Sequence, residues 1–134
     1  MDTSILLRTH SDFRYLVIAV VVLALLKLLI GLVSGSRWGR LDQIAGTAFP
    51  IVFDIQLLFG LVLWVVEQRW SGADPTRSWE HPVTMILAIT AAHIAWSRAK
   101  KQSADAAKFR TAFFGFLIAG LLMGLGVARV TGVI

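Results

Sequence analysis

Four long apolar runs alternate with short polar stretches along the chain. Each run is long enough to cross a hydrocarbon core of roughly 30 Å as a helix that rises about 1.5 Å per residue. The first helix is expected to begin before its apolar run, because Asp2, Thr3 and Ser4 are good N-cap residues. The pattern predicts four membrane-spanning helices, at about residues 5–33, 44–66, 79–97 and 109–128.

Short connections between these runs favour an up-down-up-down arrangement, in which sequential helices are neighbours and the first and third are diagonal partners. The fold class expected is therefore all-α: an integral membrane four-helix bundle in a single domain over residues 1–134.

Composition strengthens the membrane interpretation. Apolar residues make up 57% of the chain, more than a wetted surface usually allows. The net charge is +5, and the basic residues that produce it lie between the apolar runs rather than along one solvated face. Lipid headgroups, not nucleic acid, are therefore the expected anionic neighbours. The chain has no cysteine, which excludes disulfides, iron–sulfur clusters and thiol chemistry.

The basic residues predict an orientation in the membrane. Seven lysines and arginines belong to the side that holds the connections after the first and third helices, against five on the opposite side. Because loops rich in Lys and Arg stay in the cytoplasm, we expect a multi-pass protein of the plasma (inner) membrane with both ends outside. The seven are Arg37, Arg40, Arg98, Lys100, Lys101, Lys108 and Arg110.

One group of polar residues lies at the predicted outer face. His10 and His81 begin the first and third helices, so they are expected at the same depth on diagonal helices. Two facing imidazoles are typical axial ligands of a b-type haem iron. Arg8 and Arg14 are then placed to pair with the haem propionates, and Glu80 adjoins His81. The alternative is that both histidines are simply hydrated at the interface.

A second group lies deeper. Lys27, Asp54 and His93 fall at similar depths, which predicts a Lys27–Asp54 pair with His93 nearby. In one interpretation Lys27 extends to the headgroups, while Asp54 and Gln56 bond between helices. In the other, the three ionisable groups form a proton pathway. Asp42 and Asp105 are expected to be solvated loop charges.

Small residues indicate how the helices approach one another. Ala88, Ala91, Ala92 and Ala95 form a stripe on the third helix, and Gly120 and Gly124 form a GxxxG pair on the fourth. Helices in lipid associate through such close contacts. Packing inside the bundle is favoured over a contact between subunits.

Three segments together resemble a family of small four-helix bacterial membrane proteins that loosely carries the label cytochrome b-like. The segments are Thr9-His10-Ser11-Asp12-Phe13-Arg14-Tyr15-Leu16, Asp54-Ile55-Gln56-Leu57-Leu58-Phe59-Gly60 and Glu80-His81-Pro82. The resemblance implies that the positions of interest are His10, Arg14, Gln56, Glu80 and His81. The sequence departs from the family at Asp54, where other members carry histidine.

Three functional hypotheses follow, none with independent catalytic activity. The first is an electron-transfer protein that holds haem b through His10 and His81. The second is an accessory or assembly subunit, associated with other membrane chains or with copies of itself. The third is a small transporter or proton pathway through Lys27, Asp54 and His93. An electron-transfer subunit satisfies the first two.

Overall fold

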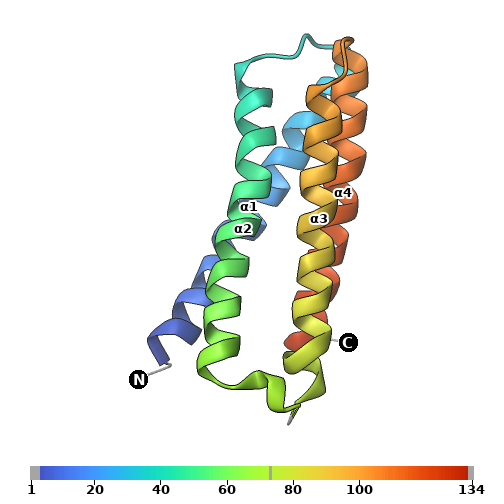
Figure 1. Cartoon of the computed structure of the whole chain (residues 1–134). Helices are drawn as coiled ribbons and strands as arrows, with labels where there is room; N and C mark the ends of the chain where they lie inside the picture. Colours follow the sequence, from blue (N-terminus) through green and yellow to red (C-terminus); the bar gives the residue numbers. More distant parts are fainter. Residues whose placement is uncertain (1–3, 73, 133–134) are drawn as a thin grey trace.

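Four long helices make up most of the protein in a computed structural model that describes residues 4–72 and 74–132 (Figure 1). The predicted N-cap residues Asp2 and Thr3 lie outside the described residues. A 3₁₀ turn, η1, covers Arg69–Ser71, and a π-helical turn, η2, covers Thr76–Glu80 just before the third long helix. The long helices are α1 (Ser4–Ser34), α2 (Arg40–Val66), α3 (His81–Lys100) and α4 (Asp105–Val130).

Each long helix packs against its neighbours in the chain, and α1 also packs against α4. The connections at residues 35–39 and 101–104 lie at one end of the molecule (Figure 1). The η1 turn, in the connection between α2 and α3, and both chain ends lie toward the other end. α3 and α4 run side by side with the most extensive contact.

The helices extend beyond their apolar runs into polar sequence. α2 begins at Arg40 rather than near Ile44, because the carboxylate of Asp42 accepts a hydrogen bond from the Gly39 N–H at 2.9 Å. α4 begins at Asp105. This places a negative charge in the first turn, where it complements the helix dipole. Apolar content alone therefore marks where a helix can cross lipid, but not where it begins.

Within the described residues, three helices are long and apolar enough to cross a membrane: α1, α2 and α4. α3 does not reach that level, contrary to the sequence-based expectation. The residues that lower its mean hydropathy most are His81, His93, Arg98 and Lys100.

Aromatic rings fill the centre of the bundle. Phe49 of α2 and Phe116 of α4 are fully buried and stack with centroids 4.1 Å apart and planes only 4° from parallel. Trp96 of α3 lies beside Phe116, with the ring centroids 6.4 Å apart. This layer joins three helices across the axis of the bundle.

Small residues set the α3–α4 distance. Ala88, Ala92 and Ala95 are buried, as the predicted stripe requires. A Cβ added to Gly115 would collide with the Ala95 side chain, so only glycine permits this approach. Of the predicted GxxxG pair, Gly120 faces Val21 of α1, whereas a Cβ on Gly124 would meet no described atom within 4 Å.

Candidate functional site

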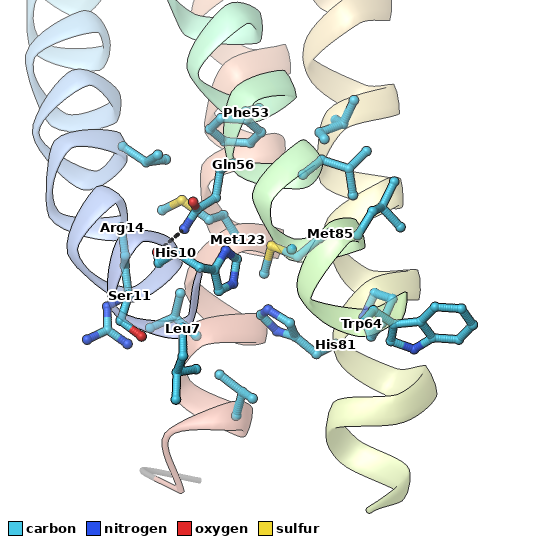
Figure 2. A pocket seen from close by; sticks show the side chains of 18 of the residues that line it. Leu7, His10, Ser11, Arg14, Phe53, Gln56, Trp64, His81, Met85 and Met123 are labelled. Carbon is cyan, nitrogen blue, oxygen red and sulfur yellow. Dashed lines mark hydrogen bonds between the residues drawn. The ribbon is translucent and has the colours of Figure 1, made fainter. Parts of the chain in front are cut away.

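A cavity of about 380 Å³ opens between the four helices, toward the end that holds the chain termini. All four long helices contribute side chains to its wall (Figure 2). Its lining is mainly apolar and includes Phe53, Met85 and Met123. A volume in this range accommodates a small organic ligand rather than a few water molecules.

His10 and His81 face one another across this cavity (Figure 2). Their ring centroids are 6.3 Å apart, and the planes are nearly perpendicular at 81°. Two metal–nitrogen bonds of about 2 Å each, with the halves of two imidazole rings, span a separation of this size. The structure therefore brings together the two histidines that the sequence paired by depth.

Glycine makes room for the His10 ring. A Cβ on Gly60 of α2 would lie 3.1 Å from His10 Cε1, closer than side chains normally pack. One turn earlier on the same helix, the Gln56 side-chain amide donates a hydrogen bond to the His10 backbone carbonyl at 2.9 Å. Gln56 and Gly60 thus fix the position of α1 so that the imidazole enters the cavity.

Two buried polar atoms of the cavity lining make no hydrogen bond of ideal geometry with the described residues. They are Nδ1 of His10 and Oε1 of Gln56. Buried polar atoms in folded proteins are nearly always hydrogen-bonded or liganded. The two side chains are neighbours, because the Gln56 amide interacts with the His10 ring, and both line the cavity.

Cationic side chains reach the cavity from two elements. Arg14 of α1 lines it, as predicted, and its guanidinium also donates a hydrogen bond to the Tyr15 hydroxyl at 3.2 Å. Arg69 lines it too and forms an ion pair with Glu67 at 2.9 Å. The predicted Arg8 is exposed and does not belong to the described lining. Arg69 takes the place that the sequence assigned to Arg8.

Glu80 forms an ion pair with Arg129 near the end of α4 rather than pointing into the cavity. Arg129 Nε donates to Glu80 Oε1 at 2.6 Å, and a second nitrogen donates to Oε2 at 3.1 Å. The hydrogen bond from Arg129 lowers the pKa of the Glu80 carboxyl below its usual value. This two-point pair connects the start of α3 to α4 next to His81.

Several lining residues were missed by the sequence analysis: Trp64, Arg69, Met85 and Met123. Helical spacing offers a signal for one of them, because Met85 follows His81 by four residues and shares its face. The Trp64 indole donates a hydrogen bond to the Ser78 carbonyl at 2.7 Å, which holds the η2 turn against α2. Met123 and Arg69 have no comparable signal in the sequence.

The deeper polar group divides into two separate pairs. Lys27 bonds Asp42 at 2.6 Å, not Asp54 as predicted. Asp42 is 2% exposed and also caps the start of α2, so the expectation of a solvated loop charge was wrong. Both Asp42 and Asp54 belong to α2, and Lys27 pairs with Asp42, which lies in the first turn of that helix. Lys27 therefore does not join Asp54 and His93 in a continuous pathway.

Asp54 and His93 do meet, as the sequence suggested. Asp54 Oδ1 and His93 Nε2 are 2.8 Å apart, bridging α2 and α3. The side chains are 47% and 51% exposed, so the pair lies on the outside of the bundle rather than in its interior.

No family model, curated protein or solved structure matches this chain. The resemblance to the cytochrome b-like family therefore stays a prediction. The functional argument rests on the geometry of the cavity.

Proposed function

We propose that the chain is an integral membrane electron-transfer subunit that binds a b-type haem between His10 and His81. The bundle crosses the plasma membrane in an up-down-up-down sense with both ends outside, so the cavity lies near the outer face. The observation that carries this proposal is the pair of imidazoles 6.3 Å apart across a largely apolar cavity.

Membrane insertion is supported by the outside of the bundle. Large apolar side chains are exposed around it, among them Leu23 at 66%, Ile30 at 61% and Leu121 at 65%. In water such a surface is an aggregation liability, whereas lipid tails solvate it. The backbone of a helix satisfies its own hydrogen bonds, as the interior of a bilayer requires.

Haem matches the number of ligands that this site offers. Among the described residues there is no group of three or more His, Asp or Glu side chains arranged to hold a bare metal ion. The porphyrin supplies four ligands to its iron, so two axial imidazoles from the protein suffice.

Each remaining part of the lining has a task in this proposal. His10 and His81 would hold the iron, and the apolar side chains of Phe53, Met85 and Met123 would keep water away from the bound group. Arg14 and Arg69 neutralise the propionates. The haem, when bound, supplies reversible one-electron transfer, and the axial ligands and surrounding charges set its potential.

An absorption spectrum of the protein purified from haem-replete cells tests this proposal. We expect a Soret band with the sharp α and β bands of a six-coordinate reduced b-type haem. A folded preparation that stays colourless, and that gains no Soret band on titration with hemin, would contradict haem binding.

A further inference from the structure

Three polar side chains in the second half of α3 project from the bundle on one face. Thr90, His93 and Ser97 are all exposed and are spaced by three and four residues, which places them along a single stripe of the helix. Asp54 of α2 adds its carboxylate to this stripe through its contact with His93. The opposite face of α3 is made of buried alanines that pack against α4.

This arrangement is costly in lipid. Asp54 lies near the middle of α2, and His93 lies two turns, about 10 Å, before the end of α3, so in the proposed orientation Asp54 is the deeper of the two. An ionisable side chain at mid-depth costs at least about 2.5–3.5 kcal/mol by insertion scales, and such residues normally face a bundle interior or a water-filled cavity. Here they face outward, so another surface has to cover them.

The pair has hydrogen-bonding capacity to spare. Its internal contact uses Asp54 Oδ1 and His93 Nε2, and no hydrogen bond within the described residues uses Asp54 Oδ2 or His93 Nδ1. The pair therefore presents an oxygen and a ring nitrogen side by side. When both ring nitrogens of His93 carry hydrogen, Nδ1–H is a donor beside the acceptor Oδ2, and a two-fold axis brings each opposite its complement in a second copy.

We propose that a second copy of this chain docks on the α2–α3 face. In a two-fold contact the same patch is used by both subunits, so Asp54 of each copy reaches the partner subunit's His93. Four groups then close a ring of hydrogen bonds away from lipid. Apolar side chains that flank the pair supply the packing, namely Ile51 and Leu58 on α2 and Ile86 and Leu87 on α3.

Self-complementarity favours a second copy over a different chain. A single acidic or basic group facing outward would require a partner of opposite charge. An Asp–His pair already contains one acidic and one basic group, and a two-fold axis brings Asp54 of one copy beside His93 of the partner subunit. The depth argument rests on the proposed membrane insertion but is independent of haem binding.

The test uses two chains with different affinity tags, co-expressed and extracted in mild detergent, with recovery of one tag on the other as the readout. Wild type should recover wild type. The Asp54→His chain carries two imidazoles and the His93→Asp chain carries two carboxylates, so each should recover itself at least about tenfold less, because like groups meet across the axis. Leu121→Ala, on the exposed face of α4, is the matched control and should pair normally.

Complementation identifies the occupant. Co-expressed Asp54→His and His93→Asp chains should recover one another at close to the wild-type level. The double variant Asp54→His/His93→Asp restores the pair within each chain and should recover itself. Recovery of the mixed pair no better than of each variant alone would overturn the proposal, as would a wild type that runs only as a monomer or only with a different chain.

These variants also separate the two proposals. The Soret absorption, if present in wild type, should persist in Asp54→His and His93→Asp chains, since the cavity lining includes neither residue. Loss of pairing with the haem intact would support the dimer face alone. A colourless protein that still pairs would contradict haem binding and leave the dimer face supported.

Discussion

The His10→Ala and His81→Ala variants should each lose the Soret band that we expect of the wild-type protein. The two rings face one another in the cavity with their centroids 6.3 Å apart, and in the proposed function they would supply the nitrogen ligands of a haem that has no covalent link to the protein. Purified variants should therefore contain far less haem per chain, measured as pyridine haemochrome.

The third histidine provides the control for this experiment. His93→Ala removes an imidazole from the outside of the bundle, remote from the cavity lining, and should retain haem at the wild-type level. His10→Gln keeps a polar side chain of similar size and should still lose haem. Equal haem content in His93→Ala and His10→Ala would refute axial ligation by His10, provided that circular dichroism shows both variants to be helical.

Phe116→Ala should lower the free energy of unfolding by about 3–5 kcal/mol, the usual cost of deleting a buried phenylalanine ring. Phe116 is fully buried, stacks on Phe49 and contacts Trp96, so its loss opens a cavity between three helices. Reversible denaturation in detergent micelles measures the change.

Phe114 is the matched comparison because it lies on the same helix but is 51% exposed. Phe114→Ala should change the free energy of unfolding by less than about 1 kcal/mol. If both variants lose similar stability, the aromatic layer formed by Phe49, Trp96 and Phe116 is not the centre of the fold.

The helices could be predicted from the sequence because long apolar runs mark all four of them, and three of these helices are long and apolar enough to cross a membrane. The residues at which the helices begin could not be predicted in this way, because α2 and α4 begin in polar sequence. At the start of α2, Asp42 accepts a hydrogen bond from Gly39, and at the start of α4 the charge of Asp105 complements the helix dipole. The weaker hydropathy of α3 comes mainly from its histidines and basic residues. Polar residues along its exposed stripe face outward, while its buried alanines face α4.

Only part of the candidate site could be predicted from the sequence. Depth along a helix follows from counting residues, so His10 and His81 were matched correctly. Direction around the helix depends on how each helix is rotated, which counting does not give. Lys27 was therefore assigned to Asp54 although it bonds Asp42, and Arg69, in a connection, was not considered for the cavity at all.

The central claim is that the chain crosses the membrane four times, so that the starts of α1 and α3 share one face. The chain has no cysteine, so single cysteines can be placed at exposed positions and labelled in intact cells with a membrane-impermeant maleimide. Ser71→Cys and Thr131→Cys report the end of the bundle that holds the cavity, and Ser36→Cys and Ser103→Cys report the other end.

We expect labelling of the first two variants in intact cells, and labelling of the second two only after the membrane is permeabilised. This outcome requires α3 to span the bilayer despite its polar stripe. If Ser71→Cys and Ser103→Cys react from the same side, α3 does not cross, and the membrane-spanning bundle that places His10 beside His81 is contradicted.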